Sequence, residues 1–301
     1  MKKLLVTLLS AMAISMPMAA DSFTAEYNGV LMTFQVLTSN TCCLQGNPSG
    51  DDEVEDAPAI PTNTTGIVTV PSAINGYTVT GIGSVAFCGC TEVTQVVLPS
   101  TITSLGVDAF HGCSSLTSIN IPSDVTYIPN QCFYGCTSLR SISLPSNLTG
   151  IGECAFRYCS VLSDATIPNK VTHIGGGAFQ GCNLARVNIP ASVRTIQTAA
   201  FDSYHDLDVY VSDLTAWCNL STADDDEYSD IFGSAKPHLY YNSYGSTGLW
   251  TAFSIPSGVT QIRYQAFSKF SDIQRIILPS SITSIQSGRP ANRISSVTSA
   301  K

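Results

Sequence analysis

Residues 109–128 read AFHGCSSLTSINIPSDVTYI, and this stretch decides the fold because close copies of it recur along the chain. Phenylalanines recur at a step of 23 residues and then at two later positions, namely Phe87, Phe110, Phe133, Phe156, Phe179, Phe201 and Phe267. Cysteines keep the same step at Cys90, Cys113, Cys136, Cys159 and Cys182. Prolines keep it at Pro99, Pro122, Pro145 and Pro168. Three residue types in one register indicate a repeat architecture, in which stacked units share one core.

Each repeat has the pattern of two short strands joined by a turn. Leu116, Ile119 and Ile121 place apolar side chains on one side of an extended segment. Pro122 ends that strand, because proline cannot donate the next ladder hydrogen bond. Residues 125–128 predict a second extended segment of the same turn. One unit cannot bury these residues alone, so we expect a solenoid in which neighbouring turns form parallel β-ladders.

The segment before the first strand is expected to be compact. Ala109, Phe110 and Cys113 suit a single helical or 3₁₀ turn that directs the last two side chains to the same side. The interval from Phe201 to Phe267 is 66 residues, or three steps of 22, which predicts two degenerate turns between them.

The repeated unit A-F-x-x-C-x-x-L-x-x-I-x-I-P-x-x-V-x-x-I-G resembles the BspA-like leucine-rich-repeat family of bacterial surface proteins. The resemblance covers residues 81–211 closely and residues 254–285 again. Residues 72–82 look like the insertion in the first turn of that family, and residues 210–218 look like its irregular turn. The resemblance implies a secreted or surface-attached protein that works in adhesion or protein binding.

The chain divides into six segments along its length. Residues 1–20 carry Lys2 and Lys3, a short apolar run and small residues, which is typical of a secretory signal peptide, and they predict a secreted or cell-surface protein. Residues 21–70 combine an N-terminal β cap, with a hairpin turn at Asn28-Gly29, and an acidic loop. Regular repeats occupy 71–211, degenerate turns 212–253 and resumed repeats 254–285. Residues 286–301 depart from the repeat, as expected of a truncated, frame-shifted or naturally short end.

Composition excludes some classes of function. Charged residues are only 12% of the 301 residues, and the net charge is −8 without a basic cluster, so nucleic-acid binding is not expected. No stretch reaches the roughly 18 apolar residues that a transmembrane helix needs. Motifs of nucleotide-binding proteins, zinc proteases and serine hydrolases are missing, and four scattered histidines (His111, His173, His205 and His238) suggest no catalytic triad. We therefore expect no enzyme activity and no cofactor.

The cysteines and acidic runs are better explained by structure than by metal binding. The five cysteines of the repeat fit a small buried slot, whereas metal sites gather ligands in clusters. An odd total of 11 cysteines leaves at least one thiol free. A Cys132–Cys154 disulfide is one alternative, and Cys42 or Cys43 with Cys88 is a weaker one. Residues 51–56 and 224–227 are acidic but lack the spacing of a calcium loop, so we expect solvated loops.

The candidate binding surface lies on the outward side of the first strands. Most of its side chains are small, polar and uncharged, at Gln95, Ser118, Asn120, Ser141, Ser143, Asp164, Thr166, Arg186 and Asn188. Two tyrosines of the irregular region, Tyr241 and Tyr244, are added as exposed anchors, whereas Trp217 is expected in the core. We expect these residues to bind a host extracellular-matrix or cell-surface protein. A glycan ligand and a structural spacer role are the alternatives, and the oligomeric state stays open.

Overall fold

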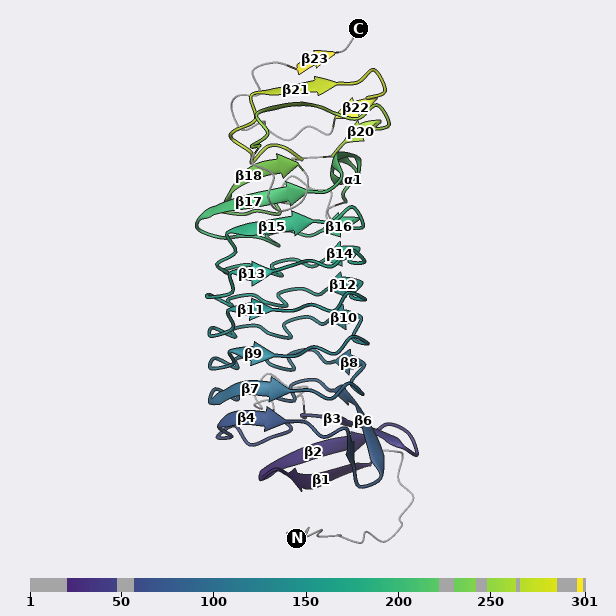
Figure 1. Ribbon diagram of the computed structural model, residues 1–301, viewed down its shortest axis with the longest axis vertical. Coiled ribbons are helices and arrows are strands. Elements are labelled where there is room, and N and C mark those ends of the chain that lie inside the picture. The colour runs from purple at the N-terminus through teal and green to yellow at the C-terminus, as the bar shows by residue number, and fades with distance from the viewer. Residues whose placement is uncertain are drawn as a thin grey trace.

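A computed structural model describes residues 21–47, 57–221, 230–241, 248–263, 266–285 and 297–299. The described chain forms a solenoid in which two stacks of short strands run along opposite sides (Figure 1). The cap strands β1 and β2 lie at one end and the strand β23 lies at the other. The expected repeat solenoid with parallel β-ladders is confirmed.

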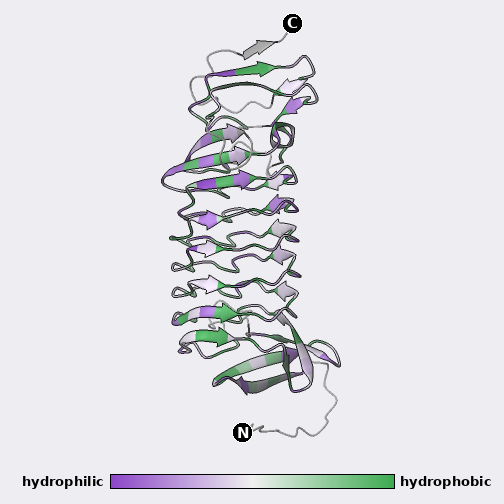
Figure 2. Cartoon of the chain, in the orientation of Figure 1, coloured by the Kyte–Doolittle hydropathy of each residue, from purple (hydrophilic) through white to green (hydrophobic). Residues whose placement is uncertain are grey.

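The first strands of successive turns form the first-strand face. They are β4 (Gly66–Thr69), β7 (Val93–Val97), β9 (Ser118–Ile119), β11 (Ser141–Ile142), β13 (Asp164–Ala165), β15 (Arg186–Ile189), β17 (Asp206–Val211), β18 (Lys236–Tyr241), β19 (Ala252–Ser254), β21 (Arg275–Leu278) and β23 (Val297–Ser299). They fall into four sheets, β4-β7-β9, β11-β13, β15-β17-β18 and β19-β21-β23, within which neighbours pair in parallel. In the regular turns the step between paired strands is that of the sequence repeat, as in Ser141 opposite Asp164. Apolar and hydrophilic residues alternate along the longer strands (Figure 2), so one side faces the core and the other faces solvent.

The second strands form the opposite face. They are β6 (Tyr77–Ile82), β8 (Ser104–Leu105), β10 (Tyr127–Ile128), β12 (Gly150–Ile151), β14 (His173–Ile174), β16 (Thr195–Ile196), β20 (Gln261–Ile262) and β22 (Ser284–Ile285). Threonine hydroxyls reinforce this ladder, since the Oγ1 of Thr149 donates to the carbonyl of Thr126 at 2.9 Å, and Thr172 donates to that of Thr149 at 3.1 Å.

The cap extends the second-strand face beyond the first turn. β1 (Ser22–Tyr27) and β2 (Val30–Val36) form an antiparallel hairpin through Asn28 and Gly29, both at positive φ. β3 (Thr41–Leu44) pairs with β2 and lies parallel to β6. β5 (Ala73–Ile74) forms a second hairpin with β6 within the expected insertion. The cap strands therefore join the sheet that contains β6 and β8 of the second-strand face.

The core fills the space between the faces. Every regular turn buries equivalent side chains, which in the turn of residues 109–128 are Ala109, Phe110, Cys113, Leu116, Val125 and Ile128. The rings of Phe110 and Phe133 stack with centroids 5.1 Å apart and planes 2° apart. Similar stacks join Phe87, Phe156, Phe179 and Phe201 to this column.

The Ala-Phe-x-x-Cys segments are single hydrogen-bonded turns and do not continue into helices. They form a third side of the solenoid, which we call the connecting face. The Cys113 N–H donates to the Phe110 carbonyl at 3.2 Å, which is the i→i+3 bond of a single 3₁₀-type turn. Asp108 at φ 55° precedes the segment and Gly112 at φ 70° lies within it, and such values are incompatible with a continuous helix. The Phe110 N–H instead donates to the Cys132 carbonyl of the next turn at 2.8 Å. Among the described residues, α1 (Leu214–Cys218) is the only helix.

In the irregular region, Phe232 and β18 form an intermediate turn, in which the Phe232 ring packs against Phe201. β19 is a further first strand before β21. β17 and β18 keep the parallel ladder through this region. At the far end, β23 pairs with β21, so residues 297–299 add another first strand where the sequence suggested that the repeat stops.

Candidate functional site

The predicted surface column lies on the first-strand face, and its members differ in exposure. Ser118, Asn120, Ser141, Ser143, Asp164, Thr166 and Arg186 are exposed, whereas Gln95 and Asn188 are half-buried. The parallel register brings Gln95 opposite Ser118, and Ser141 opposite Asp164. The side chains therefore form a continuous row that follows the axis of the solenoid.

A shallow depression lies over β11 and β13. Its volume is about 630 Å³. Ser141, Ser143, Asp164 and Thr166 line it, together with Ser146 and Asn169 from the proline turns, and Ile142, Leu144, Ile167 and Pro168. Hydroxyl, amide and carboxylate groups thus surround a partly apolar base. This combination suits hydrogen bonding to an uncharged polar ligand rather than charge pairing.

Asn120 has a structural role that the sequence did not indicate. Its Nδ2 donates to the Leu98 carbonyl at 2.8 Å, and its Oδ1 accepts from the Leu98 N–H at 2.9 Å. Because both ends of the amide are bonded to the preceding turn, Asn120 braces the ladder between β7 and β9. Its role as a ligand contact stays a prediction.

Aromatic and charged residues extend the column toward the C-terminal end. Arg186, Asp208 and His238 are opposite one another on β15, β17 and β18. Tyr210 and Tyr240 stack with centroids 4.9 Å apart. Burial and the nearby Asp208 carboxylate raise the pKa of Tyr240 above its ordinary value. This extension could have been inferred from the alternation within residues 206–211 and 236–241.

The two tyrosines predicted from the sequence, Tyr241 and Tyr244, stay predictions. The Tyr241 side chain and all of Tyr244 lie outside the described residues. Among the described residues, Tyr240 is half-buried and stacks on the buried Tyr210.

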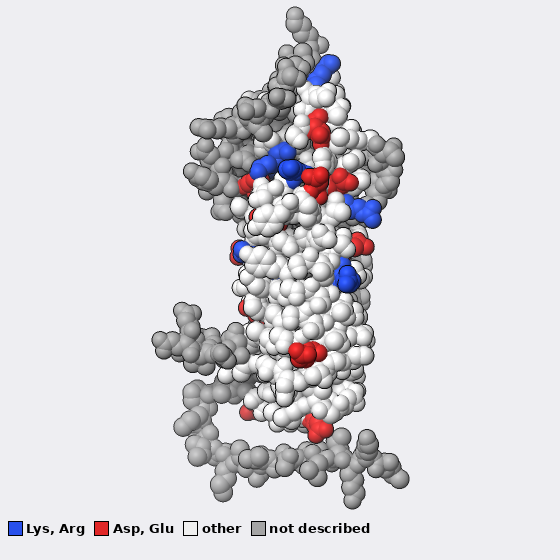
Figure 3. Space-filling model, turned by 90° about the vertical axis from the view of Figure 1, so that its left-hand side faces the viewer, with Lys and Arg blue, Asp and Glu red and all other residues white. Residues whose placement is uncertain are grey.

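Charged side chains are unevenly distributed on the molecule. The side in Figure 3 has few charges along the middle of the solenoid and more of them toward the C-terminal end. There His238 pairs with Asp272, and Lys269 contacts Asp230 at 2.7 Å. Both pairs link the intermediate turn to the next one. These ion pairs connect adjacent turns and do not form a charged ligand site.

The cysteines are thiols, all eleven lie within the described residues, and none forms a disulfide. The Cys113 Sγ donates to the Phe87 carbonyl at 3.1 Å, and the same bond recurs for Cys136, Cys159 and Cys182. Burial raises the pKa of Cys90 to about 12 and that of Cys113 well above its ordinary value. The sequence predicted a small buried residue here, but not its hydrogen bond.

Other candidates for chemistry are dispersed. The His111 ring stacks on Tyr134, His173 lies on β14, and His205 Nδ1 lies 3.0 Å from the Asp206 carbonyl. Among the described residues, no three potential metal ligands gather in one place. The two acidic runs, at 51–56 and 224–227, lie outside the described residues.

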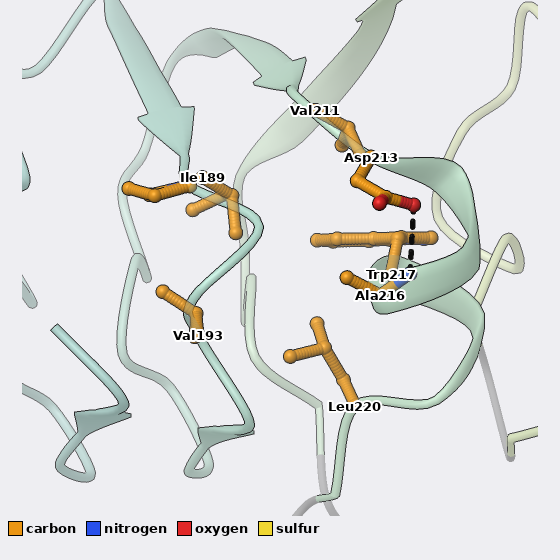
Figure 4. A pocket seen from close by; sticks show the side chains of 8 residues that line it. Ile189, Val193, Val211, Asp213, Ala216, Trp217 and Leu220 are labelled. Atoms are coloured by element: carbon orange, nitrogen blue, oxygen red, sulfur yellow. Dashed lines mark hydrogen bonds between the residues drawn. The ribbon is translucent and has the colours of Figure 1, made fainter. Parts of the chain in front are cut away.

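A second space adjoins α1 but is filled by side chains. Trp217 lies in the core, as expected, and packs toward Ile189, Val193 and Leu220 (Figure 4). These side chains leave no room for a water molecule. Asp213 caps the helix by accepting from the Thr215 N–H at 2.7 Å. This region therefore serves packing and does not hold a ligand. In the part of the chain that is described, none of the helices has the length and hydropathy of a membrane span.

Comparison with known proteins gives a consistent result. A family profile for the BspA type leucine rich repeat region matches residues 80–208 and 238–295 in six copies. No curated protein matches the chain. Among solved structures, a leucine rich repeat protein of T. pallidum is 26% identical, with a TM-score of 0.50, and the match covers 70% of this chain and 83% of that one.

Two further bacterial structures resemble the chain. A leucine-rich repeat protein of Bacteroides ovatus shares 24% identity, with a TM-score of 0.51, over 85% of this chain and 74% of that one. A leucine rich cell surface protein of Faecalibacterium prausnitzii shares 25% identity, with a TM-score of 0.51, over 91% of this chain and 73% of that one.

Proposed function

Because the chain belongs to the family of proteins with BspA type leucine rich repeats, we propose that it is a secreted or cell-surface binding protein that adheres to a host extracellular-matrix or cell-surface protein. The observation that carries the proposal is the depression over β11 and β13, where outward hydroxyls and a carboxylate are held on a hydrogen-bonded ladder. A rigid ladder presents these groups with little loss of conformational entropy on binding. The signal-like segment at residues 1–20 and the similarity to a cell surface protein support the location.

Binding without catalysis is the role that these side chains support best. The residues around the depression include serine hydroxyls but neither histidine nor cysteine. A serine nucleophile needs an adjacent base to accept its proton. The Cys113 thiol of the core donates to the Phe87 carbonyl, and burial raises its pKa well above the ordinary value. The outward groups thus offer hydrogen bonds to a ligand rather than a nucleophile.

The test is a set of lysine substitutions in the depression. Ser141→Lys, Ser143→Lys and Thr166→Lys combined should weaken saturable binding to immobilised collagen, laminin or fibronectin at least about tenfold, because bulk and charge replace hydroxyls. Thermal stability should change little, since all three side chains are exposed.

The control combines three lysines elsewhere on the surface, at Ser100, Ser104 and Ser123, which are also exposed. This variant should bind like the parent chain. If the parent chain shows no saturable binding to any matrix or cell-surface protein, the spacer role replaces the proposal. Loss of folding in the first variant would contradict the surface position of the three residues.

A further inference from the structure

Aromatic side chains form a row on the connecting face, away from the depression. The position after the core phenylalanine holds His111, Tyr134 and Arg157 in three successive turns, and Tyr158 follows. The His111 and Tyr134 rings stack with centroids 4.7 Å apart. The Tyr134 and Tyr158 rings meet edge to face at 5.4 Å. We call His111, Tyr134, Arg157 and Tyr158 the aromatic row.

Tyr158 stands where the neighbouring turns have glycine. The equivalent residues Gly112, Gly135 and Gly181 have φ between 69° and 72°, and Tyr158 has φ 61°. The backbone hydrogen bond is also the same, since the N–H groups of Gly112 and Tyr158 both donate to the next turn at 2.8 Å. This conformation is unfavourable for a side chain such as tyrosine. The turn imposes this conformation in every copy, so a tyrosine here carries backbone strain that glycine avoids in the neighbouring turns.

The Tyr158 side chain is held in place although it is 43% exposed. The Nη2 of Arg157 donates to the Tyr158 hydroxyl at 3.0 Å, and the guanidinium lies 4.8 Å from the ring centroid. The Nη1 of Arg157 also donates to the Cys154 Sγ at 3.8 Å. Arg157 is therefore occupied in positioning the ring. Such an arrangement lowers the entropic cost of binding.

The surface beside the row is open. A Cβ added at Gly89 would meet nothing within 4 Å, and one at Gly112 would meet only backbone of Gly89 at 3.9 Å. Toward the next turns, Gln180 Nε2 donates to the Asp202 carboxylate at 2.8 Å. A ligand can thus approach the backbone closely beside the rings and reach polar groups at one end.

We propose that the aromatic row binds a neutral oligosaccharide. A sugar ring has apolar C–H faces that pack on aromatic side chains and hydroxyls that bond to phenol, imidazole and amide groups. The row spans three turns, or roughly 10 Å at the spacing of strands, whereas a stable protein interface needs about 800 Å² from each partner. Two guanidinium nitrogens of Arg157 are engaged by Tyr158 and Cys154, and the net charge of −8 disfavours an acidic sugar. This site is separate from the depression and does not depend on the proposed adhesion to protein.

The experiment applies the full chain to a printed array of neutral and sialylated oligosaccharides, followed by titration calorimetry with the strongest binder. Tyr158→Gly removes the ring and introduces the glycine that the neighbouring turns have at the equivalent position. It should keep the thermal transition and weaken binding at least about tenfold, which corresponds to roughly 1.4 kcal/mol. The matched control is Tyr127→Ala, because Tyr127 is also 43% exposed but lies on the second-strand face. It should bind like the parent chain.

Several outcomes would overturn the proposal. They are an array without any signal, binding restricted to sialylated glycans, unchanged affinity in Tyr158→Gly, or loss of glycan binding in the lysine variant of the depression. If Tyr158→Gly fails to fold, Tyr134→Ser takes its place, since Tyr134 is half-buried and its φ is not positive. If the parent chain binds glycan but no matrix protein, the proposed adhesion is refuted and the proposed glycan site is still supported.

Discussion

Single backbone conformations set the shape of each turn. The residue two positions before the core phenylalanine has a positive φ in successive turns. Asp108 and Gln131, both at 55°, are examples. The glycines two after it, such as Gly112, have φ near 70°. The recurrence of glycine was visible in the sequence. The positive φ at Asp108 and Gln131 was not, because neither residue type requires it.

Gly112→Ala should reduce the free energy of unfolding by about 1 kcal/mol. An added Cβ would meet no atom closer than 3.8–3.9 Å, so the loss would report backbone strain and not a clash. Urea denaturation measures the change. Gly258→Ala is the control, because Gly258 has open space and no positive φ. Equal effects of the two substitutions would show that φ is not the cause.

At the scale of elements, the sequence predicted the strands of the regular repeats and missed the helix α1, which interrupts them. β9 and β10 lie within the extended segments predicted at residues 116–121 and 125–128, because every regular copy buries the equivalent side chains. α1 carries no such period and covers fewer than two turns of helix. Its start was nevertheless encoded by Asp213, whose Oδ1 accepts from the Thr215 and Ala216 N–H groups.

Asp213→Ala should cost about 1 kcal/mol, because two N–H groups at the start of α1 lose their acceptor. Asp213→Asn should recover most of this loss, since asparagine caps comparably. Urea denaturation followed by the fluorescence of the buried Trp217 gives both values. If the asparagine variant is as unstable as the alanine variant, the carboxylate acts through charge and not through capping.

At the scale of the whole molecule, periodicity predicted which residues form the core. It did not show which outward side chains are engaged within the ladder and which are open to a ligand. Ser143 and Asn120 occupy equivalent outward places in the sequence, yet only the asparagine amide is bonded to the preceding turn. The aromatic row was missed for a related reason. Its residues occupy variable slots, and only the stacking of turns brings His111 and Tyr134 into contact. Binding surfaces of a solenoid therefore depend on side-chain contacts between turns that no single repeat encodes.

The buried thiols predict that the solenoid loses stability in alkali. Burial raises the pKa of Cys90 and Cys218 to about 12 in the folded chain, against 9.0 when exposed. Above about pH 9 the unfolded chain releases these protons first, so each thiol lowers the free energy of unfolding by about 1.4 kcal/mol per pH unit until its folded pKa is reached.

Urea titrations from pH 7 to 10.5, with reductant present, measure this effect. The contribution of the two thiols to the free energy of unfolding should be constant up to pH 8 and should fall beyond it. The combined variant Cys90→Ala and Cys218→Ala should have a shallower fall, even though it is less stable at pH 7. An identical slope in both chains would show that these thiols do not control alkaline unfolding.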